Sequence, residues 1–159
     1  MKLTRRYHFS ASHRLHSDIL SDAENDRLYG KCNNPFGHGH NYRLEVTVSG
    51  KLDGSAHTLV PLPVLDRLVR EQILDLLDNR NLNLDVPQFA GSVPTTENLI
   101  LVIASVLEGN WNAYLGDLPV RLHGVHIQET DRNGFEVLLQ APQRISEPHS
   151  SAESATINA

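Results

Sequence analysis

The strongest constraint on the fold is an alternation of apolar and polar side chains over residues 40–51. The odd positions from 43 to 49 are polar, whereas the even positions carry apolar side chains, namely Tyr42, Leu44, Val46 and Val48. Successive side chains of a β-strand point to opposite faces of its sheet. The stretch therefore predicts a strand with one buried face and one solvated face.

Three further segments predict strands. Residues 3–13 alternate well enough to form a first strand before the one over residues 40–51. Residues 120–129 and 135–139 predict two more, joined by a turn whose Asn133-Gly134 pair favours a hairpin.

Between the second and third strands, Leu, Ile and Val recur at three- and four-residue spacing in two segments, which predicts two helices. The first helix is expected to begin at Pro61 and Pro63 and to end near residues 78–83. The second is expected to begin at Thr95, whose hydroxyl can cap the first amides, and to end at residues 109–110, a Gly-Asn pair.

The predicted order is β-β-α-α-β-β, an α+β unit with a four-stranded antiparallel sheet and two helices on one face. Its outer strands would be unpaired, so we expect sheets of several copies to join in a homo-oligomer. Residues 15–34 are rich in polar side chains without a period and are interpreted as a long loop. Residues 1–142 are expected to form one domain, followed by a disordered tail over residues 143–159.

Composition narrows the function further. A chain with 40% hydrophobic residues can form one core, and its net charge of -5, with scattered Lys and Arg, argues against nucleic acid or an anionic membrane as a partner. We find no secretory signal and no apolar run of membrane-spanning length, so we expect a soluble, cytoplasmic protein. The lone Cys32 cannot form an internal disulfide and stays available as a thiol.

Histidines gather close to that cysteine. Cys32 precedes the pair His38 and His40 by six residues, and residues two apart on a strand can converge on one ion. His13 ends the first predicted strand and can approach the pair if the chain returns alongside. Three imidazoles leave an open position, which is the catalytic pattern for zinc, whereas Cys32 as a fourth ligand would close the site.

Other polar residues are candidates for chemistry. Cys32 lies in a polar stretch, and a nearby dication would lower its pKa, so that it could act as a base or nucleophile. Glu129 is an even number of residues from Val125 and Ile127, so its carboxylate ends the apolar face of the predicted strand. A carboxylate in such a position needs a hydrogen-bonding partner, and a ligand with an NH-rich ring could provide it.

Five motifs now line up in order with a known family. They are Phe-Ser-Ala-Ser-His-Arg-Leu at 9–15, a Cys and His-x-His segment at 29–42, Asn-Leu-Asn-Leu-Asp-Val-Pro at 81–87, Thr-Thr-Glu-Asn-Leu at 95–99 and Glu-Thr-Asp at 129–131. Over about residues 5–140 the chain resembles the 6-pyruvoyl-tetrahydropterin synthase family, which includes the 6-carboxytetrahydropterin synthases of the queuosine pathway. Ordered motifs are far more specific than a single one.

The resemblance implies a tunnelling fold, in which three copies form a barrel and two trimers stack into a hexamer. It implies a zinc-dependent lyase that converts 7,8-dihydroneopterin triphosphate to 6-pyruvoyl-tetrahydropterin with loss of triphosphate. Its implied site residues are the zinc ligands His13, His38 and His40, the proton-abstracting Cys32, the pterin-gripping Glu129, and the further pterin-pocket residues Thr95, Thr96 and Glu97.

Two positions depart from the family. Its members usually carry Asp-His after the first helix, where this chain has Asp78-Asn79, so that Asp78 remains as a catalytic candidate and Asn79 cannot carry a proton. The family also tends to place Asn or Asp before that helix, where residues 60–63 read Val-Pro-Leu-Pro. The family itself leaves the 6-carboxytetrahydropterin reaction as an alternative, and Asn79 in place of the relay histidine adds another, a pterin-binding homologue with weakened catalysis.

Overall fold

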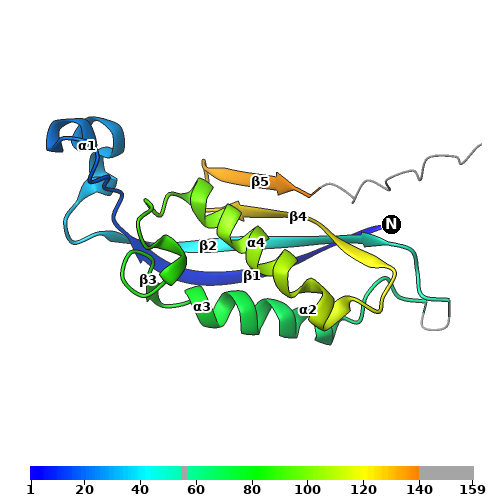
Figure 1. The fold of residues 1–159 in the computed structure, drawn as a ribbon. Helices are drawn as coiled ribbons and strands as arrows, with labels where there is room; N and C mark the ends of the chain where they lie inside the picture. The colour runs from blue at the N-terminus through cyan, green and yellow to red at the C-terminus, as the bar shows by residue number, and fades with distance from the viewer. Residues whose placement is uncertain (55–56, 140–159) are drawn as a thin grey trace, which may run out of the picture.

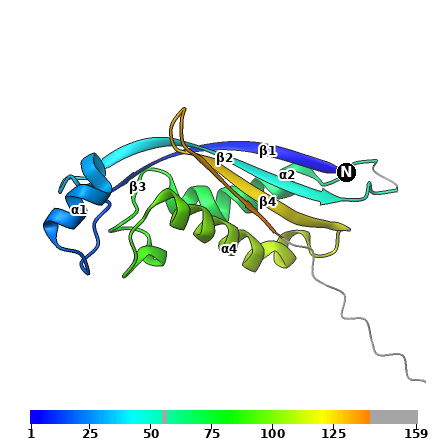
Figure 2. The ribbon, with the colours of Figure 1, turned by 90° about the horizontal axis from the view of Figure 1, so that it is seen from above.

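A computed structural model describes residues 1–54 and 57–139 of the chain as one sheet with helices on one face (Figure 1). The sheet has the strand order β3-β1-β2-β4-β5. Its strands are β1 (Lys2–His13), β2 (His38–Gly50), β3 (Arg80–Asn81), β4 (Val120–Gln128) and β5 (Gly134–Leu138). Figure 2 shows the helices α2 and α4 beneath the curved sheet, and the described residues place no helix on its other face.

The four predicted strands are present and pair antiparallel. The sheet also contains β3, which was not predicted and which pairs parallel with β1 at Ala11 and Ser12. The described sheet is therefore five-stranded and mixed rather than four-stranded and antiparallel. A two-residue strand is too short to leave an alternating pattern in the sequence.

The first predicted helix is a helical rod of three parts, lying against the sheet (Figure 1). It consists of α2 (Leu62–Val69), a π-helical turn (Arg70–Leu74) and α3 (Asp75–Leu77). Pro61 is its N-cap residue, and no side chain caps it. The departure from the family in residues 60–63 thus leaves this helix without the polar cap that Asn or Asp can provide.

The second predicted helix, α4 (Thr96–Leu115), begins where expected, and the Thr95 side chain accepts a hydrogen bond from the Asn98 N–H. The prediction that it ends at residues 109–110 was wrong. Trp111 and Leu115 are 8% and 1% exposed, so the buried stripe continues for another turn and outweighs the Gly-Asn stop signal. A 3-10 turn (Pro87–Phe89) lies between β3 and α4.

The interpretation of residues 15–34 as a loop was also wrong. The segment contains the helix α1 (Asp22–Tyr29) and a 3-10 turn (Gly30–Asn33). A capping box between Ser21 and Glu24 begins the helix, but its only buried residue is Asn25, so no apolar period marks it. Figures 1 and 2 both place α1 beyond the end of the sheet, away from α2 and α4.

The core lies between the sheet and the helices α2–α4. The apolar side chains predicted for β2 are fully buried there, facing helix residues such as Leu65, Leu68, Ile73, Leu99 and Ile103. None of the described helices is long and apolar enough to cross a membrane. The predicted tail over residues 143–159 lies outside the described residues.

Candidate metal centre

Strand pairing brings the three predicted histidines together. His13 is the last residue of β1 and lies opposite His38, the first residue of β2, while Ala11 lies opposite His40. One ring nitrogen from each histidine lies within 4.8 Å of the others, and the two Nε2 atoms of His13 and His38 are 3.3 Å apart. The described chain therefore places three imidazoles where one metal ion could bind.

The hydrogen bonds around this cluster suit a cation. His13 Nδ1 lies 2.9 Å from the Pro94 carbonyl oxygen, which can only accept, so Nδ1 donates and a neutral His13 has its Nε2 lone pair facing the cluster. Within the described residues, His40 Nε2 is buried without a hydrogen-bond partner. A divalent cation would satisfy such nitrogen atoms.

Burial also favours the form that binds metal in two of these rings, His13 and His38. Desolvation is the main cause that lowers the pKa of His13 and of His38, and the neighbouring imidazoles lower both pKa values further. The Pro94 carbonyl and the Glu129 carboxylate act in the opposite direction on the His13 pKa but do not reverse the shift. Neutral imidazole is the ligand form of histidine, so metal binding competes little with protons here.

A carboxylate borders the histidine cluster. Glu129 follows β4, its side chain is 13% exposed, and its Oε1 accepts a 2.6 Å hydrogen bond from the Thr96 hydroxyl. The same Oε1 lies 3.7 Å from His40 Nε2. Glu129 thus ends the buried face of β4, as its sequence position relative to Val125 and Ile127 predicts, and the structure places it beside the histidines.

The Cys32 thiol lies on the 3-10 turn after α1 and is partly buried. Burial raises its pKa, and the negative charge of Glu129 raises it further. The protein alone therefore favours the thiol over the thiolate, and a bound cation would have to oppose that shift. In the parts of the chain that are described, Cys32 does not belong to the group of ligand atoms formed by the three histidines.

The remaining predicted residues lie in different settings. Thr95 caps α4, Thr96 is buried and bound to Glu129, and Glu97 is exposed in the first turn. Asp78 Oδ1 accepts a 2.8 Å hydrogen bond from the Ser10 N–H. This carboxylate therefore ties the end of α3 to the β1 backbone, and among the described residues it makes no hydrogen bond to the histidine cluster.

Asn79 adds a second contact between the end of α3 and the β1 backbone, and it also lines a cavity. Its N–H donates to the Ser10 carbonyl oxygen at 2.6 Å, and its backbone has a φ of 58°, a left-handed conformation that Asn tolerates. A cavity of about 510 Å³ is lined by Asn79 together with Ser10, Ser12 and Asn41, whose parity places them on the sheet face without helices.

Sequence reasoning missed two groups at the cluster. The Pro94 carbonyl orients His13, and a backbone atom leaves no signature in a sequence. Tyr42 was assigned only to the core, yet its ring centroid lies 5.6 Å from that of His40, and its buried hydroxyl lacks a hydrogen-bond partner of standard geometry among the described residues. Its position two residues after His40 on the same strand face could have indicated this.

Comparison with known proteins assigns the family. The model of the family described as 6-pyruvoyl tetrahydropterin synthase matches residues 2–139. The 6-pyruvoyl tetrahydrobiopterin synthase of Poecilia reticulata is 48% identical over 132 residues, which cover 82% of this chain and 85% of that protein. The protein of the same name from Homo sapiens is 47% identical over 133 residues, covering 83% of this chain and 87% of that protein.

Solved structures agree with this assignment. The 6-pyruvoyl tetrahydropterin synthase of Caenorhabditis elegans is 38% identical, has a TM-score of 0.78, and the match covers 88% of this chain and 96% of that one. The synthase of Plasmodium vivax, 15% identical with a TM-score of 0.61 over 86% of this chain and 96% of that one, shows the shared fold alone. The chain belongs to the 6-pyruvoyl tetrahydropterin synthase family.

Proposed function

We propose that this chain is a zinc-dependent carbon–oxygen lyase that converts 7,8-dihydroneopterin triphosphate to 6-pyruvoyl-tetrahydropterin and triphosphate. Family membership supports the reaction, since the relatives compared above are synthases of this name. The observation that carries the proposal is the cluster of His13, His38 and His40 with the buried Glu129 carboxylate 3.7 Å from His40. A metal ligand set and a group that can recognise a pterin thus occur side by side.

His13, His38 and His40 would hold the zinc ion. Three imidazole nitrogens with an open fourth position are the usual ligand set of catalytic zinc, and the substrate's side-chain hydroxyls would take the open position. When bound, zinc supplies Lewis acidity that polarises these hydroxyls and acidifies the neighbouring C–H bonds. The Pro94 carbonyl keeps the His13 ring oriented for this task.

Glu129 would bind the amino-pyrimidine edge of the pterin. An ionised carboxylate can accept two N–H hydrogen bonds, and donors of this kind line that edge of the ring. The Thr96 hydroxyl already fixes Oε1, so little ordering of the Glu129 side chain remains to be done when the substrate binds. Thr95 and Glu97, at the start of α4, are proposed to line the same pocket.

Cys32 would act as the base. It takes a proton from the carbinol carbon next to the ring, and the electron pair of that C–H bond shifts toward the ring C=N bond, whose nitrogen takes up a proton. Tautomerisation then leaves a ketone at that carbon and a ring reduced to the tetrahydro level. Loss of a proton from the next side-chain carbon breaks the C–O bond to triphosphate, and the resulting enol takes up a proton at its terminal carbon to give the diketone. Since burial and Glu129 raise the Cys32 pKa, the thiol becomes a competent base only when a cation is present to oppose them.

We also propose that copies of the chain assemble through their sheet edges into a barrel and then a hexamer, in the cytoplasm. Among the described residues, β5 pairs only with β4, and β3 covers the outer edge of β1 only at Ala11 and Ser12. Open edges of this kind favour pairing between copies. Asp78 would then serve as a proton-relay group in the site of a neighbouring copy.

Asn79 raises the question of how protons reach the site. An amide cannot titrate, so the Asn79→His variant, which restores the family's residue, is expected to raise kcat, by up to about 100-fold if proton transfer limits turnover. The left-handed φ of 58° is one that His also adopts. An unchanged kcat would show that another group carries the relay.

The product of the reaction tests the proposal. Zinc-loaded protein is incubated with 7,8-dihydroneopterin triphosphate, and the product is identified by mass, with Cys32→Ser as the inactive control. Recovery of a pterin with a three-carbon side chain supports the proposed reaction. Recovery of 6-carboxytetrahydropterin assigns the chain to the queuosine reaction instead, and intact substrate after long incubation contradicts both.

A further inference from the structure

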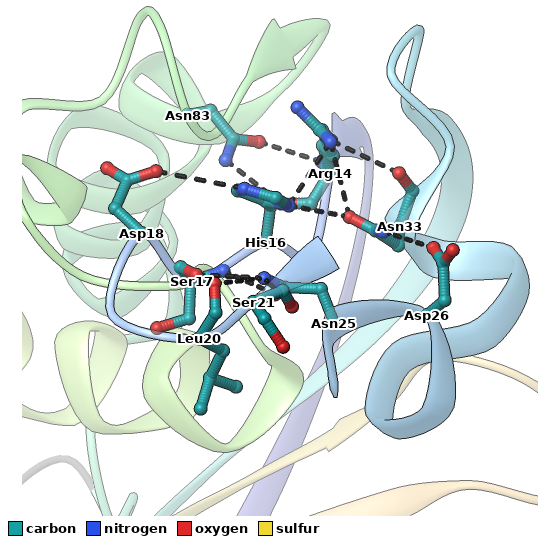
Figure 3. A network of polar contacts seen from close by, with 10 residues as sticks. All are labelled: Arg14, His16, Ser17, Asp18, Leu20, Ser21, Asn25, Asp26, Asn33 and Asn83. Carbon is teal, nitrogen blue, oxygen red and sulfur yellow. Dashed lines mark hydrogen bonds and ion pairs between the residues drawn. The ribbon is translucent and has the colours of Figure 1, made fainter. Parts of the chain in front are cut away.

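We infer that Asn33 is a positioning residue that holds the Cys32 thiol in register with the histidine cluster, acting through a polar network on the arm formed by residues 17–37. This inference rests on the role proposed for Cys32. Figure 3 shows Asn33 between the side chains of Arg14, His16 and Asp26.

The arm needs such a device because it has little apolar packing. Ile19, Leu28 and Phe36 are 93%, 64% and 95% exposed, whereas Asn25 and Asn33 are buried. The arm leaves the sheet at the end of β1 and returns at the start of β2, and both figures of the fold place its helix beyond the sheet (Figures 1 and 2). Polar contacts rather than a core must therefore set the position of Cys32.

The Asn33 side chain uses both ends of its amide. Its Nδ2 donates to Asp26 Oδ1 at 2.6 Å, which fixes the 3-10 turn to α1. Its Oδ1 lies 2.8 Å from His16 Nδ1 and accepts a weaker hydrogen bond from an Arg14 nitrogen at 3.3 Å. The residue is 8% exposed, so these bonds are largely shielded from water.

The same network connects the turn to the strand that carries His13. The Leu15 N–H donates to the Cys32 carbonyl oxygen at 2.8 Å, and Arg14 Nε donates to the Asn33 carbonyl oxygen at 3.1 Å. Arg14 is fixed in turn by Asn83, which bonds both its N–H and its carbonyl oxygen. The carbonyl groups of Cys32 and of Asn33 are thus bonded to the two residues that directly follow His13.

A separate set of bonds anchors the start of the arm. Asn25 is fully buried, and its amide bonds the backbone of Ser17, Leu20 and Ser21. This set stabilises the entry into α1 but makes no bond to the Cys32 turn. Asn33 is therefore the side chain that joins α1, the Cys32 turn and the end of β1.

An exchange of donor and acceptor tests this role. Asn33→Asp keeps an oxygen for His16 and Arg14 but places two carboxylates, at positions 33 and 26, where a 2.6 Å hydrogen bond had been. Adding Asp26→Asn restores a donor and acceptor pair with the direction reversed and returns the net charge to that of the parent. Adding Asp22→Asn instead, on the exposed first turn of α1, removes the same charge without restoring the bond.

The readout is the rate of alkylation of Cys32 by iodoacetamide, which is unambiguous because the chain contains one cysteine. Zinc content, the thermal midpoint, and kcat and KM are measured in parallel. We expect Asn33→Asp to change the alkylation rate and kcat, the latter by on the order of 100-fold as for an ångström-scale displacement, with zinc content and KM nearly unchanged. Adding Asp26→Asn to the Asn33→Asp variant should restore the alkylation rate and kcat to within about threefold of the parent, whereas adding Asp22→Asn should not.

Two results would overturn the inference. One is an alkylation rate and kcat that Asn33→Asp leaves unchanged. The other is rescue by Asp22→Asn as effective as rescue by Asp26→Asn, which would show that Asn33→Asp acts only through its added negative charge. If the parent protein yields no pterin product, the proposed function fails, yet the alkylation rates of the four proteins still decide whether Asn33 positions the thiol.

Discussion

The histidine cluster and the Cys32 turn, the two halves of the site, are stabilised by different kinds of interaction. The histidines lie on β1 and β2, whose other core-facing side chains are packed against α2 and α4. Cys32 lies on the arm, where the buried side chains are asparagines and three large apolar side chains, Ile19, Leu28 and Phe36, are exposed. Apolar packing is non-directional and tolerant, whereas a hydrogen-bond network fixes geometry but opens at lower cost. We therefore expect the proposed metal ligands to lie in the more rigid part of the chain and the proposed base to lie in the part that moves more easily.

The largest effect should come from the rigid half. His13→Ala removes the proposed zinc ligand whose ring the Pro94 carbonyl orients, so we expect loss of stoichiometric zinc and of activity. Metal analysis after dialysis measures it, with His8→Ala as the control, because His8 is exposed on the face of β1 away from the core. Full zinc occupancy in His13→Ala would remove that residue from the ligand set.

Matched leucine truncations compare the two halves directly. Leu44 is 0% exposed in β2 and Leu28 is 64% exposed on the arm. Leu44→Ala is expected to lower the free energy of unfolding by about 2–5 kcal/mol, whereas Leu28→Ala should change it by less than about 0.5 kcal/mol. Urea denaturation provides both values. Similar losses for the two variants would mean that the arm has apolar packing of its own.

Asn25→Ala should loosen the arm without unfolding the core. The substitution removes the bonds to Ser17, Leu20 and Ser21, and we expect a local loss of about 1–3 kcal/mol. Hydrogen exchange should accelerate in α1 and the Cys32 turn while exchange in β1 and β2 is unchanged. Asn112→Ala, on the exposed side of α4, is the control. Faster exchange throughout the sheet would contradict the separation of the two halves.

The smallest effect concerns a polar bond within the rigid half. Arg5 and Tyr7 on β1 both bond Asp66 on α2, and the Arg5 hydrogen bond is the main cause that lowers the pKa of Asp66 from its ordinary value of 3.8. A lowered pKa in the folded state stabilises the fold above that ordinary value, and the contribution is lost as the pH falls through the folded pKa.

Asp66→Asn should therefore cost at most about 1 kcal/mol near pH 7, because the pair is partly exposed, and nearly nothing once the pH is well below the pKa of Asp66 in the folded protein. Unfolding free energies of parent and variant across this range measure the difference. A difference that grows toward low pH would have the wrong sign for this pair.

The same contrast explains what the sequence could predict. Alternation in β2 and helical spacing in α2 and α4 reflect burial, and burial follows side-chain type, so the core and the strand positions of the histidines were predictable. The arm leaves no such pattern, because Asn25 and Asn33 are buried for their hydrogen bonds. Its one readable signal was the capping box of Ser21 and Glu24, which the loop interpretation overlooked.

Site geometry was predictable only where strand parity governs it. Parity placed Glu129 correctly, whereas the contact of His13 with a backbone carbonyl and the short β3 depend on tertiary structure. For Asp78, the family resemblance implies a relay group, and its hydrogen bond in the described chain goes to the β1 backbone, so the relay role stays a prediction about the assembled protein.

X-ray absorption spectroscopy of the zinc-loaded protein tests the central claim, that the metal belongs to the rigid half alone and leaves the thiol free to react. The account predicts a first shell of three imidazole nitrogens and one oxygen, all near 2.0–2.1 Å, with no sulfur. A sulfur scatterer near 2.3 Å would show Cys32 closing the metal site as a fourth ligand, and the thiol could then not serve as the base.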